Sequence, residues 1–193
     1  MVGFNRRYAP LVERMKNLLA AAPEPKAFVM TVNAGGVPET HWTQDPAVGG
    51  GRFLGEGCHF VDLLRHLAGA PIRDFAVVPM RSATRDTGSV SLTFGDGSIG
   101  TIHYFANGSR TFPKEKLEVF VGGRILQLDN FRRLRAFGWQ GAGAVSSWRQ
   151  DKGQTGCARA FVDAITTDGL PPIPIDELIE VARLTIEISQ RFH

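Results

Sequence analysis

Cysteine is scarce in this chain, which has only Cys58 and Cys157 among its 193 residues. The two lie far apart and lack the paired spacing of a disulfide framework, so the sequence favours a reducing compartment. The N-terminus has no charged segment followed by an apolar run, the pattern of a signal peptide. We therefore expect a cytoplasmic protein.

Long apolar runs and concentrated basic charge are also missing. No stretch approaches the roughly 20 apolar residues that a membrane span needs. The 22 Lys and Arg residues barely outnumber the 19 Asp and Glu residues, which gives a formal net charge of +3. No dense basic run is interleaved with aromatic residues, so we expect neither a nucleic-acid nor a membrane partner. At 43% hydrophobic and 21% charged, the composition is that of an ordinary globular domain.

The sequence does contain a clear succession of periodic segments. Helical repeats of apolar residues cover 9–22, 155–168 and 175–192, and a further helix follows glycines 49–51 and stops at Gly69. Strand-like runs are 26–34, 74–79, 89–94, 98–106, 116–123, 124–129, 132–138 and, very short, 1–5. This order predicts an α+β fold: an open, mainly antiparallel sheet of about five to six strands with helices on one face.

One glycine motif resembles a nucleotide loop. "GDGSIG" at 95–100 fits the G-x-G-x-x-G pattern of dinucleotide-binding folds. The mechanism requires a strand before the glycines and a helix after them, whose N-terminus faces the pyrophosphate. Here a strand-like run follows instead, and Asp-Gly suits a tight turn. We therefore expect a hairpin and no cofactor-binding residues in this chain.

The helix after the glycines carries a polar face. His59, Asp62 and His66 are spaced i, i+3 and i+7, which places them on one side. The two imidazoles lie about two turns apart, ~10 Å along the axis, which disfavours a shared metal ion. His66 is expected to be structural or solvent-facing. His59, close to the glycine loop, suits acid–base chemistry at neutral pH.

The other faces of this helix are apolar, and Asp62 is expected to bond to backbone or to a neighbouring side chain. We expect a stripe of Leu54, Cys58, Val61 and Leu64 to pack on the sheet. The preceding segment, 34–51, is rich in Gly and Pro and predicts a long loop. The loop carries three polar or amphipathic residues, His41, Trp42 and Asp45. Two interpretations stay open: a binding loop, or a surface loop whose Trp42 caps the sheet edge.

These residues together resemble the C-terminal domain of the glucose–fructose oxidoreductase / inositol dehydrogenase (Gfo/Idh/MocA) family. The family pattern W-x-x-D-P-x-x-G-G-G, followed by a helix with G-x-H-x-x-D, matches Trp42, Asp45, Pro46, Gly49–Gly51, Gly57, His59 and Asp62. The segment from "DKGQ" at 151 onwards resembles the family's closing helices. The implied fold is an open antiparallel sheet flanked by helices, like the C-terminal domain of glyceraldehyde-3-phosphate dehydrogenase.

The resemblance also implies parts that this sequence lacks. Family members carry an N-terminal Rossmann domain that binds NAD or NADP and holds a catalytic lysine in an E-K-P motif. Here the only Glu-Lys pair, Glu115-Lys116, precedes a leucine in a strand-like run. We expect 1–193 to be a single substrate and oligomerisation domain, inactive alone, whose residues 1–8 resemble the junction to the absent Rossmann domain. It would be a fragment, a truncated gene product or a stand-alone relative.

The resemblance implies roles for particular residues. His59 would be catalytic, and Trp42 and Asp45 would wall the substrate pocket. The family often places an Asp four residues before the helix His; that position is Gly55 here, as in a branch of bi-domain oxidoreductases. We expect Glu56 to stand in for that carboxylate, although its direction differs by ~100°.

Arg6 and Arg7 lie at the junction that the resemblance implies, where they could bind an acidic substrate or the cofactor. The other interpretation is that both side chains are solvated. The expected function is the C-terminal half of an NAD(P)-dependent oxidoreductase acting on a sugar, polyol or related hydroxy compound. A non-catalytic dimerisation module and a small-molecule-binding module are the alternatives. A homo-oligomer is expected through an exposed sheet face bearing Phe94, Ile102, Tyr104, Val119 and Val121.

Overall fold

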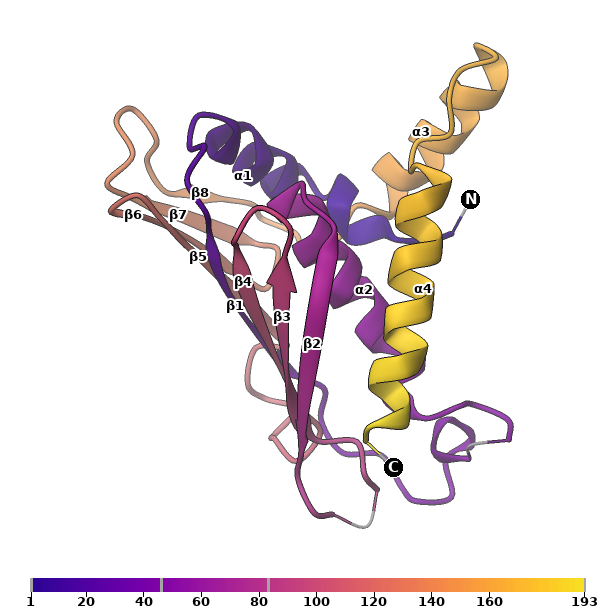
Figure 1. Ribbon diagram of the computed structural model, residues 1–193. Helices are drawn as coiled ribbons and strands as arrows, with labels where there is room; N and C mark the ends of the chain where they lie inside the picture. The colour runs from indigo at the N-terminus through magenta and orange to yellow at the C-terminus, as the bar shows by residue number, and fades with distance from the viewer. Residues whose placement is uncertain (1, 46, 83, 193) are drawn as a thin grey trace.

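One mixed β-sheet forms the body of the molecule, and its helices lie on one side of it (Figure 1). The computed structural model describes residues 2–45, 47–82 and 84–192. The α-helices are α1 Pro10–Ala20, α2 Arg52–Ala68, α3 Gln154–Thr166 and α4 Ile175–Gln190, with short 3-10 helices η1 Asn5–Tyr8 and η2 Trp42–Gln44. In the part of the chain so described, no helix combines the length and the apolar character needed to cross a bilayer.

Eight strands make up the sheet, in the order β2-β3-β4-β1-β5-β6-β7-β8. They are β1 Ala27–Asn33, β2 Ile72–Pro79, β3 Gly88–Phe94, β4 Ile99–Phe105, β5 Glu115–Val121, β6 Arg124–Asp129, β7 Arg133–Phe137 and β8 Val145–Ser146. β1 is parallel to β4, and every other neighbouring pair is antiparallel. The predicted α+β class is confirmed.

The number of strands exceeds the five to six expected. One reason is β8, which has only two residues and therefore no alternation to detect. The apolar run at the N-terminus was expected to be strand-like, and this is wrong: residues 2–4 belong to no strand and 5–8 form η1. Met1 lies outside the described residues. The turn around Gly97 joins β3 to β4 as a hairpin, as predicted.

The inner face of the sheet holds the core. Tyr104 and Ile102 of β4 and Val119 of β5 are fully buried, and Phe94 and Val121 are nearly so. The expectation that these residues form an exposed face is therefore wrong, because the strand alternation turns them towards the helices. The outer face bears the intervening residues instead, and most of them are polar, such as Thr101, Glu118, Gln127 and Arg135.

Helix α2 lies across this core, and half of the expected stripe is buried there, because Val61 and Leu64 are fully enclosed. Leu54 and Cys58 are only half-buried, whereas Phe53 and Phe60 are enclosed. Phe53 meets Tyr104 edge-on at 5.5 Å and stacks on Phe192 at 4.9 Å between ring centroids. The prediction is wrong for Leu54 and Cys58, because the larger rings of Phe53 and Phe60 pack against the core instead.

Candidate functional site

The loop before α2 is organised by its glycines and by Asp45. A Cβ on Gly49 would lie 2.6 Å from the Trp42 carbonyl oxygen, so only glycine allows the loop to fold back on η2. The Asp45 carbonyl accepts the N–H groups of residues 48, 49 and 50, and its Oδ1 accepts that of Ala47 at 2.8 Å. The Trp42 side chain is 61% exposed, so it does not cap the sheet edge. Pro46 lies outside the described residues.

Arg52, the first residue of α2, ties this loop to the end of the sheet. Its guanidinium donates to the carbonyls of Gly35 at 2.5 Å and Ala34 at 2.6 Å, and it lies 3.6 Å from the Asp86 carboxylate. Gln44 also donates to Asp86, at 3.0 Å. The sequence analysis missed Arg52 and Asp86, since nothing in the local pattern links positions 34 residues apart.

His59 lies half-buried on α2, beside Phe4, whose ring meets it edge-on at 6.2 Å. Burial, helped by the nearby Arg6 charge, lowers the pKa of His59 to about 4. Its Nδ1 is enclosed and has no hydrogen-bond partner among the described residues. The imidazole is therefore neutral at pH 7, and its Nδ1 faces the interior of the protein.

Glu56 lies one turn before His59 and faces the sheet. The Tyr104 hydroxyl donates to it at 2.7 Å, and Lys114 forms an ion pair with it. Burial disfavours its charge, but the bonds from Lys114 and Tyr104 outweigh that effect and hold the pKa of Glu56 below its usual range. Gly55, where the family often has Asp, is exposed, and a Cβ built there meets no atom within 4 Å.

A buried carboxylate, Glu115, links η1 to the segment before α3. Arg6 donates to both of its oxygens, at 2.8 and 3.0 Å, and Lys152 donates at 2.5 Å. The guanidinium of Arg6 also lies 4.7 Å from the Phe60 ring centroid. Burial disfavours the charge, but Arg6 and Lys152 hold the pKa of Glu115 below its ordinary value. Both interpretations of Arg6 are thus wrong, because its charge is neutralised within the core.

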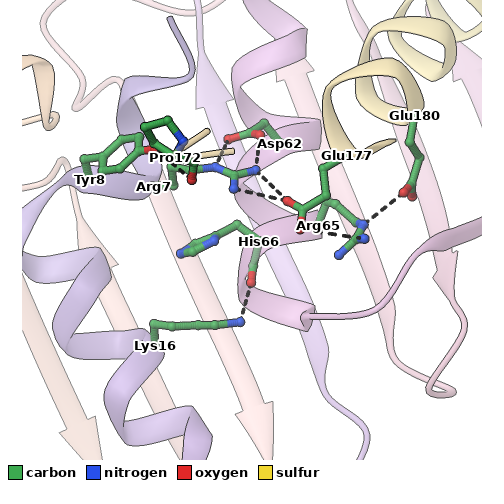
Figure 2. A network of polar contacts seen from close by, with 9 residues as sticks. All are labelled: Arg7, Tyr8, Lys16, Asp62, Arg65, His66, Pro172, Glu177 and Glu180. Carbon is green, nitrogen blue, oxygen red and sulfur yellow. Dashed lines mark hydrogen bonds and ion pairs between the residues drawn. The ribbon is translucent and has the colours of Figure 1, made fainter. Parts of the chain in front are cut away.

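Arg7 is buried in the same way on the other side of η1 (Figure 2). It binds both carboxylate oxygens of Asp62 and lies 3.1 Å from Glu177 of α4. Burial disfavours the charged guanidinium, but the two carboxylates outweigh that cost and raise the pKa of Arg7. Arg7 is therefore neither solvated nor directed at a ligand. Asp62 bonds to a neighbouring side chain, as predicted.

His66 sits deeper along α2. Burial and the nearby cations Arg7, Lys16 and Arg65 lower its pKa to about 3, and its backbone carbonyl accepts a bond from Lys16 at 2.5 Å (Figure 2). Within the described ranges, no three His, Cys, Asp or Glu side chains are grouped as metal ligands would be. His59 and His66 thus have different surroundings: His59 lies beside Phe4 and Arg6, and His66 lies beside Lys16 of α1.

The comparison with protein families defines the class of this fold and site. The sequence profile described as the GFO/IDH/MocA C-terminal domain matches residues 20–123, more than half of the chain. The chain belongs to the GFO/IDH/MocA family. The matched region contains the glycine loop, α2 and the strands β1 to β5.

Individual relatives agree with this assignment. A protein named as an oxidoreductase, YceM of Salmonella typhimurium, is 24% identical over 95% of this chain and 58% of its own length. Levoglucosan dehydrogenase, solved with NADH and levoglucosan, shares the fold with a TM-score of 0.81 at 19% identity, over 98% of this chain and 63% of that one. UDP-N-acetylglucosamine 3-dehydrogenase GnnA from Acidithiobacillus ferrooxidans gives 0.77 at 16% identity, over 99% and 62%. The chain thus spans about 60% of the length of these relatives.

Proposed function

We propose that this chain is the C-terminal substrate-binding and oligomerisation domain of an NAD(P)-dependent oxidoreductase acting on a sugar, polyol or related hydroxy compound. The observation that carries the proposal is His59, a half-buried neutral imidazole on α2, the helix that directly follows the glycine-built loop. Levoglucosan dehydrogenase and GnnA, which share the fold, carry substrates of this class in their names.

In this proposal His59 handles the proton of the reacting hydroxyl. NAD or NADP, bound by an N-terminal Rossmann domain, would accept the hydride from the substrate carbon. His59 would accept the hydroxyl proton as the carbonyl forms. Its low pKa keeps the imidazole unprotonated at pH 7, and loss of the burial that lowers this pKa would make it a stronger base.

The other candidate residues take supporting parts. The exposed Trp42 indole offers a flat apolar wall on which a sugar ring can stack, and the backbone of Asp45 holds the loop that presents it. Glu56 contributes a carboxylate whose position is fixed by Tyr104 and Lys114. With Gly55 in front of it, the substrate side of His59 has room that an Asp side chain would otherwise fill.

Self-association through the outer sheet face is also part of the proposal. Cross-strand pairing aligns five residues into one apolar row at the hairpin end of that face: Ile99, Ala27, Phe120, Ile125 and Phe137. Ile99, Phe120 and Phe137 are between 41 and 57% exposed. This exposed apolar row favours a homo-oligomer. A non-catalytic dimerisation module would expose the same kind of row, so the row does not separate the two functions.

Activity of a reconstituted two-domain enzyme separates these possibilities. The part of YceM outside the 58% matched by this chain would be fused to this chain, and NAD-dependent oxidation of sugars and polyols would be measured, with the unfused chain as the blank. His59→Ala should lower kcat by about a hundredfold or more. His103→Ala, on the outer face of β4, is the matched control and should leave kcat unchanged.

Two results would contradict the proposal. Unchanged turnover in His59→Ala, with folding intact by circular dichroism, would reduce His59 to a structural residue. Micromolar binding of NAD to the chain alone, measured by calorimetry, would mean that it carries a cofactor site of its own.

A further inference from the structure

A pocket of about 670 Å³ lies at the outer face of the sheet, which the helices leave uncovered (Figure 1). Cross-strand pairing aligns its outer-face residues into one polar row: Thr31, Lys116, Asp129, Arg133 and Ser146. Along β1 and β5 this row is four residues from the apolar row, ~13 Å away. The pocket and the apolar row are therefore separate surfaces, and the pocket has the size of a small-molecule site.

The pocket contains two arginines without a carboxylate partner. Its lining includes four cations: Lys116, Arg132, Arg133 and Arg135. Lys116 pairs with Glu118 at 2.9 Å. Arg135 pairs with Asp129 at 2.7 Å, and the remaining acid of the lining, Glu115, is already neutralised from within the core. Arg132 and Arg133 have no ion-pair partner among the described residues, so the pocket has two uncompensated positive charges.

This charge suits a phosphate monoester, which carries close to two negative charges at pH 7. Guanidinium groups match phosphate oxygens in a bidentate geometry. The Arg132 guanidinium is held in place by the Trp148 carbonyl, to which it donates at 3.1 Å. Hydroxyl groups of Thr31, Ser146 and Ser147 line the same pocket and can donate to further phosphate oxygens.

Phe112 gives the pocket an apolar wall beside the charged groups. Its side chain is 66% exposed, and Pro113 lies next to it in the lining. An exposed aromatic ring of this kind can stack on the carbon skeleton of a sugar, whereas free phosphate would make no use of it. The combination of a cationic end and an aromatic wall therefore favours a phosphorylated organic molecule.

We propose that this pocket binds the phosphate monoester of a small polyhydroxy compound, such as a sugar phosphate. The site is distinct from that of His59, because His59 lies on α2 at the inner face and the polar row lies on the outer face. The ligand is therefore an effector or second ligand of the protein, and not the molecule whose hydroxyl would react at His59. The inference is independent of the reaction proposed above.

Calorimetry on the chain, at fixed ionic strength, tests this site with glucose 6-phosphate as the probe. The probe should bind saturably, and glucose should not bind. Arg132→Gln and Arg133→Gln should each weaken binding by at least about tenfold, because each removes a charge-assisted contact. Both side chains are exposed, so folding should be unaffected, and Arg14→Gln on the exposed side of α1 is the matched control. Unchanged affinity in the two pocket variants, or no binding to the wild-type chain, would refute the proposal.

Two further comparisons identify the ligand and the location of the site. Inorganic phosphate should bind more weakly than glucose 6-phosphate, and Phe112→Ala should remove that difference. Equal affinities in the wild-type chain would overturn the assignment of an organic ligand.

Phe120→Lys, in the apolar row, should bind the probe as the wild-type chain does. Loss of binding in this variant would mean that the site forms only between two copies, contrary to its assignment to one chain.

Discussion

Glu115 is the residue on which the most buried charge converges. Its side chain is 1% exposed, and it neutralises both Arg6, at 6%, and Lys152, at 18%. Removing one member of such a group leaves the other charges in the core without a counter-charge. These three residues therefore form a structural linkage between η1, β5 and the start of α3, although Arg6 was considered as a possible ligand of the substrate or cofactor.

Glu115→Gln is expected to destabilise the fold by about 3–5 kcal/mol, because it strands two buried cations. The free energy of unfolding in urea measures this. Glu118→Gln on the same strand is the control. It removes the partner of Lys116, in a pair whose side chains are 25% and 44% exposed, and should cost less than about 1 kcal/mol. Equal effects of the two substitutions would show that Glu115 does not bear the linkage.

His66 gives the stability a pH dependence. Its pKa is about 3 in the folded state and 6.5 without the fold, so the folded protein resists protonation. The stabilisation is complete above pH 6.5 and is lost as the pH falls towards 3. His66→Gln should flatten the decrease of Tm between pH 7 and pH 4, since glutamine does not titrate. Parallel Tm curves for the two proteins would contradict the assignment.

At the scale of elements, the start of α3 depends on a single glycine. Gly153 has φ +84° and approaches the backbone of Asn5 and Ala9 within 2.4 Å of where a Cβ would stand. Gly153→Ala should therefore cost more than about 2 kcal/mol, through strain and displacement of η1. Gly123 also has a positive φ, but a Cβ there meets no atom, and Gly143 has neither the positive φ nor a close atom. The loss of stability measured by thermal unfolding should therefore be largest for Gly153→Ala, smaller for Gly123→Ala and smallest for Gly143→Ala.

Local signals specified most elements. The alternation in β3, β4 and β5 and the Asp-Gly turn predicted hairpins, because each depends on residues next to one another. Non-local partners could not be predicted: β1 inserts between β4 and β5, and the buried arginines find Asp62 and Glu115 from 55 and 109 positions away. The face of α2 that meets the sheet was likewise set by Tyr104, on a distant strand.

For the whole molecule, the apolar row on the outer sheet face predicts a dimer. Phe120→Lys should shift the population towards monomer by at least about tenfold in dissociation constant, because a desolvated lysine opposes association. Light scattering over a range of concentrations measures this. Leu170→Lys, between α3 and α4 and 90% exposed, is the control and should leave the dimer intact. A wild-type chain that is monomeric at high concentration would contradict the proposed interface.

The position of β1 also dictates when this domain can be completed. β1 ends at Asn33, but its neighbours in the sheet are β4, which begins at Ile99, and β5, which ends at Val121. At the ~5–20 residues per second of protein synthesis, β1 leaves the ribosome several seconds before either neighbour exists. A nascent chain therefore carries an apolar strand with two open edges, and these edges are paired only after β4 and β5 have been made. During that interval the open edges of β1 are the part of the nascent chain most able to pair with a strand of another chain.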